Sequence, residues 1–186
     1  MHVIFIAPHF PANQRQFVRA LKEIGCRVSG IIDVSYEYVD SETKRMLDDY
    51  ETVPSVTSLD HVVAAVQKIQ ARGPWVHHLE AAVEAHMLVC AKAREICSIP
   101  GLPYSVVERC RDKVVMKGFL RDRGFPVARD AAVDNGKQAR MAASRVGYPL
   151  ILKPRAGAGA SATYRVQNQK ELELAIRTEQ LDKLSK

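Results

Sequence analysis

The stretch that decides the fold covers residues 147–161 and reads Gly147-Tyr-Pro-Leu-Ile-Leu-Lys153-Pro-Arg-Ala-Gly-Ala-Gly-Ala-Ser161. An apolar run ends at Lys153, and a loop of small residues follows it directly. A second strand-like run, residues 162–166, then completes a hairpin. Glycines let backbone amides approach phosphate oxygens, and a lysine adds a positive charge. The hairpin therefore predicts a loop that binds phosphate.

Two other interpretations of this loop were compared with the phosphate-binding one. A P-loop is excluded because the stretch has no Gly-Lys-Ser/Thr and a strand, not a helix, follows the glycines. An ordinary hairpin with a flexible tip explains the loop equally well when the loop is considered alone. The residues upstream favour phosphate binding.

A helix with two well-defined ends is predicted upstream of the hairpin. Asp112 can cap its start, Gly124 can end it in the left-handed conformation, and Pro126 forbids its continuation. Lys113 and Lys117 lie one turn apart on a shared face of this helix. Two lysines near the start of a helix are suitable partners for an anion.

The segments on either side of the hairpin complete a small α+β unit. We expect a short strand at residues 127–133, a turn at 134–136 and a helix at about 137–146. A last helix begins near Gln169. The hairpin therefore lies between two helices in the sequence.

These motifs resemble the first half of an ATP-grasp fold, in the branch of biotin carboxylases, carbamoyl phosphate synthetases and amino-acid ligases. In chain order they are Asp112-Lys113-Val, Met116-Lys117, Gly124-Phe-Pro126-Val, Gly147-Tyr-Pro149-Leu-Ile-Leu-Lys153-Pro and Gly157-Ala-Gly159-Ala-Ser161. The resemblance covers residues 105–186 well and the preceding part more loosely.

The resemblance implies that Lys113 and Lys153 contact ATP phosphates and that Lys153 is the catalytic lysine. It also implies that the glycine-rich loop folds over the phosphates. The members of this loop are Arg155, Ala156, Gly157, Ala158, Gly159, Ala160 and Ser161. ATP and Mg²⁺ are the implied cofactors, with the metal ligands expected downstream of this chain and none within it. Lys117 takes no role from the family.

The sequence also departs from the family pattern, because it stops after the first lobe. Family members continue with a hinge strand that reads adenine and an acidic strand pair that holds magnesium. Phosphoryl transfer needs that metal to neutralise charge between the phosphates. We therefore expect a truncated part of a larger enzyme, inactive on its own.

The first hundred residues alternate between apolar strands and helices. Strands are predicted at residues 3–7, 27–33, 52–54 and 75–79, and helices at 14–24, 59–71 and 81–96. This alternation predicts an α/β fold with a doubly wound parallel sheet, which the resemblance identifies as a pre-ATP-grasp domain. The expected organisation is a Rossmann-like domain at 1–104, a linking helix at 105–126 and the small α+β ATP-grasp lobe at 127–186.

Parallel sheets bind ligands beyond the carboxyl ends of their strands, which makes His9 and Glu80 candidate substrate residues. Glu80 closes a predicted strand and opens a predicted helix, and we favour the interpretation that it complements the helix dipole. A nicotinamide cofactor is not expected, because residues 7–11 lack the glycines of the dinucleotide fingerprint.

Composition narrows the class of protein further. No run approaches the ~20 apolar residues of a membrane span, and the N-terminus lacks the basic flank and cleavage site of a signal peptide. The four cysteines show no Cys-x-x-Cys spacing, so we expect buried thiols in a reducing cytoplasm. The net charge is +6, but the basic stretch lacks interleaved aromatic residues, which argues against nucleic-acid binding.

The sequence therefore predicts the N-terminal part of an ATP-dependent ligase. The complete enzyme would activate a carboxylate or bicarbonate as an acyl phosphate and form a C–N bond. ATP and a small carboxylate are the expected partners, no membrane is involved, and a homodimer stays open. The alternative is a non-catalytic α/β module that binds a nucleotide or another anion. The choice between biotin carboxylase and amino-acid ligase also stays open.

Overall fold

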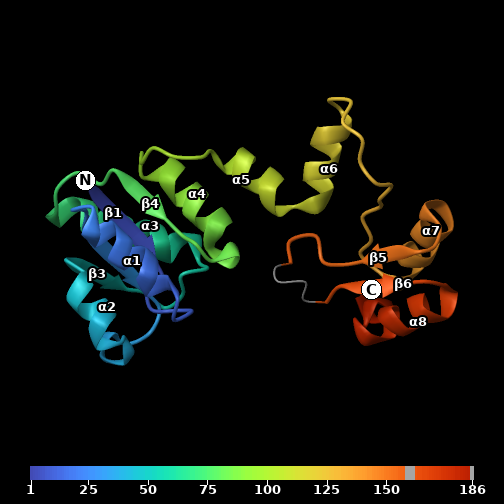
Figure 1. Ribbon diagram of the computed structural model, residues 1–186, viewed down its shortest axis with the longest axis horizontal. Coiled ribbons are helices and arrows are strands. Elements are labelled where there is room, and N and C mark those ends of the chain that lie inside the picture. The colour runs from blue at the N-terminus through green and yellow to red at the C-terminus, as the bar shows by residue number, and fades with distance from the viewer. Residues whose placement is uncertain (158–161, 185–186) are drawn as a thin grey trace. The chain divides into compact units, whose positions relative to one another are not determined.

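A computed structural model of the protein describes residues 1–157 and 162–184. The chain divides into two compact units, Met1–Val107 and Glu108–Lys186 (Figure 1). The division falls within helix α5, which spans Tyr104–Arg111.

The first unit, described throughout, is a four-stranded parallel sheet covered by helices. Its strands are β1 (His2–Ile6), β2 (Arg27–Ile32), β3 (Asp49–Thr52) and β4 (His78–Glu80), in the order β3-β2-β1-β4. Its helices are α1 (Gln14–Glu23), α2 (Ser41–Met46), α3 (Leu59–Arg72) and α4 (Met87–Ile96), with short 3-10 turns η1 (Tyr36–Tyr38) and η2 (Glu84–His86). The predicted α/β class with a parallel sheet is confirmed.

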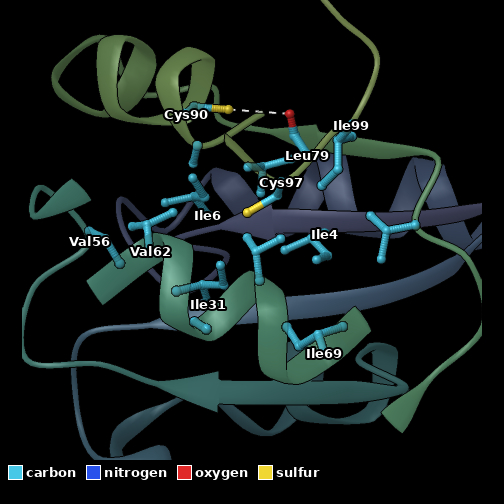
Figure 2. Close-up of a cluster of buried hydrophobic side chains, with 14 of the residues drawn as sticks. Ile4, Ile6, Ile31, Val56, Val62, Ile69, Leu79, Cys90, Cys97 and Ile99 are labelled. Carbon is cyan, nitrogen blue, oxygen red and sulfur yellow. Dashed lines mark hydrogen bonds between the residues drawn. The ribbon is translucent and has the colours of Figure 1, made fainter. Parts of the chain in front are cut away.

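Both faces of this sheet are covered, because successive strand residues point to opposite sides. Val3 and Phe5 pack with Val18 of α1 on one face. Ile4 and Ile6 pack on the other face, against buried side chains of α3 and α4 (Figure 2). A strand that is apolar on both sides is the signature of a parallel sheet between two helical layers.

Three cysteines contribute to these cores as free thiols, Cys26 on one face of the sheet and Cys90 and Cys97 on the other. The Cys90 thiol donates a hydrogen bond to the carbonyl oxygen of Leu79, 3.2 Å away (Figure 2). Burial raises the pKa of Cys90 to about 12. Cys110 differs from these three because its side chain is exposed.

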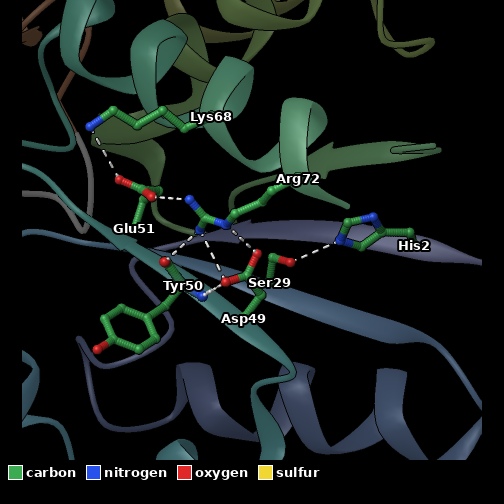
Figure 3. Close-up of polar contacts among 7 residues, drawn as sticks. All are labelled: His2, Ser29, Asp49, Tyr50, Glu51, Lys68 and Arg72. Carbon is green, nitrogen blue, oxygen red and sulfur yellow. Dashed lines mark hydrogen bonds and ion pairs between the residues drawn. The ribbon is translucent and has the colours of Figure 1, made fainter. Parts of the chain in front are cut away.

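The edge strand β3 is held by a charged network at the end of α3 (Figure 3). The Arg72 guanidinium donates to both carboxylate oxygens of Asp49, at 3.0 and 3.1 Å, and pairs with Glu51. Nearby, the buried His2 ring lies 2.8 Å from the hydroxyl oxygen of Ser29. Charged side chains along an edge strand discourage pairing with another chain.

The second unit is small and is built around the predicted hairpin. Its described elements are α6 (Lys113–Arg121), α7 (Gly136–Val146), β5 (Leu150–Leu152), β6 (Tyr164–Val166), α8 (Gln169–Thr178) and the 3-10 turn η3 (Leu181–Leu184). Strands β5 and β6 pair antiparallel, with Leu150 opposite Val166 and Leu152 opposite Tyr164. The core consists of buried side chains from α7, β6 and α8. The predicted hairpin is confirmed.

Several predicted elements lie elsewhere or are missing. The third strand covers Asp49–Thr52 instead of 52–54, and the fourth covers His78–Glu80 instead of 75–79. Residues 127–133, all described, form no strand. A strand requires a hydrogen-bonding neighbour, and within the described residues β5 and β6 pair only with each other.

The predicted linking helix at 105–126 is two helices in the structure, α5 and α6. Asp112 separates them, because its backbone is extended, with φ −91° and ψ 111°. Its side chain caps α6, as the sequence predicts, by accepting hydrogen bonds from Val114 N at 2.8 Å and Val115 N at 3.1 Å. The break brings three consecutive polar side chains, residues 111–113, to the start of a helix.

Candidate functional site

A cavity of about 770 Å³ lies within the second unit, between α6, α7 and the hairpin. Lys113 and Lys117 line it from α6, and residues 149–155 line it from β5 and the start of the loop. Both lysines predicted to bind phosphate, Lys113 and Lys153, are therefore in the wall of one cavity. The other walls are mainly apolar, from alanines of α7 and from residues 128–133.

Lys113 is engaged with the loop. Its ammonium donates to the carbonyl oxygens of Arg155, at 3.1 Å, and Gly157, at 3.2 Å. Its backbone N–H also donates to the Arg155 carbonyl, at 3.1 Å. The glycine-rich loop therefore starts directly against the N-terminus of α6.

The side chains on either side of this lysine contact the same loop. The Arg155 guanidinium donates to one oxygen of Asp112, at 2.7 and 3.1 Å, and Arg111 donates to the Ala156 carbonyl at 2.7 Å. Two opposing effects act on the pKa of Asp112. Desolvation raises this pKa, but the hydrogen bonds from Arg155 and from the capped N–H groups lower it by more, so the pKa of Asp112 lies below its usual value.

Lys153 differs from Lys113 because its side chain is exposed and its ammonium has no partner within the described residues. Lys117, which also lines the cavity, donates to the Ala128 carbonyl at 3.2 Å and so fixes the segment that follows α6. The cavity thus contains one free ammonium, on Lys153, among the described lysines in its wall. Four of the predicted loop residues, Ala158, Gly159, Ala160 and Ser161, lie outside the described residues.

The two candidate substrate residues lie in the first unit, and each is paired. His9 Nε2 lies 3.2 Å from Asp33 Oδ1, and both residues follow strands at the carboxyl edge of the sheet. Burial lowers the pKa of His9, although Asp33 acts in the opposite direction. Glu80 lies 3.4 Å from the buried guanidinium of Arg94.

The preferred interpretation of Glu80 was wrong. Glu80 ends β4, but α4 begins only at Met87, so this carboxylate is not in the first turn of a helix. Arg94 also donates to the carbonyl oxygens of Leu79, at 3.1 Å, and Leu102, at 3.3 Å. Glu80 is therefore part of a polar cluster around a buried arginine.

Two contacts of the loop were not predicted from the sequence: the hydrogen bond from Arg111 to the Ala156 carbonyl, and the ion pair between Asp112 and Arg155. The available signal was the charge pattern of residues 109–113, Arg-Cys-Arg-Asp-Lys, at a helix start. His86 is buried, and burial lowers its pKa. In residues 1–157 and 162–184, no group of three or more His, Cys, Asp or Glu side chains is arranged to hold a metal ion. Across the same ranges, no helix has the length and apolarity to cross a bilayer.

Comparison with known proteins shows that a family model matches the part of the chain that contains this cavity. Residues 112–183 match the family model of the carbamoyl-phosphate synthase L chain, ATP binding domain. Over these residues the chain is similar to proteins of the ATP-grasp superfamily. The matched range contains Lys113, Lys153 and the glycine-rich loop. The resemblance stated from the sequence motifs is therefore confirmed.

Individual ATP-grasp relatives extend the similarity. The chain is 27% identical over 121 residues to the L-arginine-specific L-amino acid ligase of Bacillus subtilis, a match covering 65% of this chain and 29% of that protein. An L-amino acid ligase structure from Bacillus licheniformis matches with a TM-score of 0.77 and 20% identity, over 96% of this chain and 40% of that one.

A third relative is the biotin carboxylase domain dimer of the Hydrogenobacter thermophilus 2-oxoglutarate carboxylase, solved with MgADP, ADP and bicarbonate. It matches with a TM-score of 0.68 and 22% identity, over 93% of this chain and 40% of that one. The chain spans less than half the length of each of these relatives. Its fold, across both units, is that of the N-terminal part of ATP-grasp ligases.

Proposed function

We propose that this chain is the N-terminal part of an ATP-dependent ligase that activates the carboxylate of an amino acid. The reaction would transfer the γ-phosphoryl group of ATP to the carboxylate, giving an acyl phosphate and ADP. An amine would then displace phosphate and form a C–N bond. The match over 65% of the chain to an L-amino acid ligase supports this choice over a biotin carboxylase.

The observation that carries the proposal is the position of Lys113 and Lys153 in the wall of one cavity. Lys153 offers an ammonium without a protein partner among the described residues, at the end of β5. Ammonium groups bind phosphate oxygens through charge-assisted hydrogen bonds. We propose that the two lysines hold the phosphates of ATP and that Lys153 stabilises the charge that develops during transfer.

The apolar part of the cavity suits the rest of the nucleotide. Alanine side chains of α7 and leucines of β5 form a wall that can bury an aromatic base. Mg²⁺, when bound with ATP, would neutralise charge between the phosphates. We place its ligands in the downstream part that the ATP-grasp resemblance implies. We propose that the glycine-rich loop excludes water and so protects the acyl phosphate from hydrolysis.

The acceptor side of the reaction is proposed for the first unit. His9 and Asp33 follow neighbouring strands at the carboxyl edge of the sheet, and Glu80 ends a third strand at that edge. Parallel sheets bind small molecules at this edge. We propose that His9 and Glu80 contact the amino-acid substrates.

Trapping of the acyl phosphate tests this proposal in the complete protein that contains the chain. Hydroxylamine attacks an acyl phosphate and yields a stable hydroxamate. We expect ADP release and hydroxamate formation that require an amino acid, and loss of both in Lys153→Met. Lys170→Met, an exposed lysine on α8 outside the cavity, is the matched control and should leave both intact. ADP release that requires bicarbonate instead would indicate a carboxylase, and ATP binding without ADP release would indicate a binding module.

A further inference from the structure

Three consecutive residues at the junction of α5 and α6 hold three consecutive residues of the glycine-rich loop. Arg111 binds the Ala156 carbonyl, and Asp112 binds the Arg155 guanidinium. Lys113 binds the carbonyl oxygens of Arg155 and Gly157. We call this set, residues 111–113 with residues 155–157, the latch.

The latch occupies the donors that a phosphate would need. The Lys113 ammonium donates to two loop carbonyls, and the Lys113 backbone N–H donates to one of them. Both donors lie at the start of α6, where backbone N–H groups point outward and favour an anion. A neutral carbonyl is a weaker acceptor than a phosphate oxygen. A phosphate can therefore replace the loop carbonyls, provided that the loop moves.

We propose that the latch is an autoinhibitory contact, and that ATP binds Lys113 only after residues 155–157 release it. This inference rests on the proposed function, because it assumes that Lys113 is a phosphate ligand. The Arg155–Asp112 ion pair stabilises the latched state. Arg155 is then a positioning residue that sets how often the site is open.

The two oxygens of Asp112 separate its roles and make the latch testable. Oδ1 accepts the capping hydrogen bonds of α6, whereas Oδ2 accepts both hydrogen bonds from Arg155. In Asp112→Asn the amide oxygen can keep the cap, since asparagine is a good N-cap residue. The amide nitrogen that replaces Oδ2 cannot accept from Arg155. The substitution therefore weakens the latch, by removing its ion pair, and leaves the helix start in place.

The experiment is a double-mutant cycle on ATP affinity in the complete protein that contains the chain, measured by titration calorimetry. Asp112→Asn and Arg155→Gln should each tighten ATP binding about two- to fivefold. An exposed ion pair changes an equilibrium by about this factor, and here the equilibrium is between sites that are latched and sites that are open to ATP. In the double variant the second substitution should add less than about twofold, because the pair is already broken. The control is Asp122→Asn, at the other end of α6, which makes the same change in charge and should leave ATP affinity unchanged.

Two results would refute the proposal that the latch is autoinhibitory. Weaker ATP binding in Arg155→Gln means that Arg155 binds phosphate directly. If Asp112→Asn raises the affinity for ATP equally in the wild type and in Arg155→Gln, the Asp112 carboxylate simply repels ATP and there is no latch.

Hydrogen exchange of the Lys113 amide in the ATP-free chain provides a readout that does not depend on ATP. Exchange should be faster in Arg155→Gln than in the wild type, and unchanged exchange refutes the latch. If no variant binds ATP but exchange is faster, the proposed function fails, and with it the displacement by phosphate, while the contact between loop and helix stands.

Discussion

Replacing Lys153 with methionine removes the ammonium that the second unit leaves without a partner. The side chain is exposed, and no hydrogen bond to the described residues is lost with the amine. The free energy of unfolding should therefore change by less than about 0.5 kcal/mol. A hydrogen bond between a charged donor and phosphate contributes about 1.5–3 kcal/mol. Loss of one such bond corresponds to ATP binding about 10- to 150-fold weaker.

The assay is an equilibrium titration of ATP into the complete protein that contains the chain, with a urea unfolding curve of the 186-residue chain for each variant. Lys113→Met is the informative comparison, because it removes a phosphate ligand together with two hydrogen bonds to loop carbonyls. Lys170→Met is the control: it shows how the loss of an exposed lysine outside the cavity affects ATP affinity and stability. If Lys153→Met and Lys170→Met bind ATP equally well, Lys153 is a solvated strand-end lysine and the phosphate assignment is wrong.

Three further predictions concern stability and reactivity. Leu172→Ala should destabilise the second unit by about 2–5 kcal/mol in urea, because the side chain is buried in a small core, whereas the exposed neighbour Leu174→Ala should cost under about 0.5 kcal/mol. Burial lowers the pKa of His2 and His86 below the usual 6.5, so the unfolded state binds protons more readily. The urea midpoint of the first unit should therefore fall as the pH drops below about 6.5, and a midpoint that rises on acidification contradicts this. Iodoacetamide should modify the exposed Cys110 well before the three buried cysteines, as peptide mass mapping can show; equal labelling would mean that the cores open readily.

The parts of the fold that the sequence predicted well are those with strong local signals. Continuous apolar runs predicted β1 and β2 almost to the residue, and the cap at Asp112 predicted the start of α6. The turn predicted at residues 134–136 placed the start of α7 within one residue. The hairpin was predicted because two short apolar runs flank a loop of small residues. In each case the information lies within about ten residues of the element.

The missed features depend on contacts between distant residues. The register of β3 is set by its pairing with residues 29–32 of β2, and the sequence of β3 itself, with alternate exposed residues, is weakly apolar. The latch is also non-local, since Asp112 and Arg155 are 43 residues apart. The charges of residues 109–113 were visible, but nothing in the sequence says which of them meets the loop.

The polar groups of the two units are used differently, and this affects what each can contribute to binding. Lys153 is free among the described residues, whereas His9 and Glu80 are paired with Asp33 and Arg94. A paired group must give up its partner when it binds a ligand, so its net gain is smaller than that of a free group. We therefore expect affinity for ATP to come mainly from the second unit. The first unit should act chiefly on selectivity, because a substrate must match the polar pairs that are already formed there.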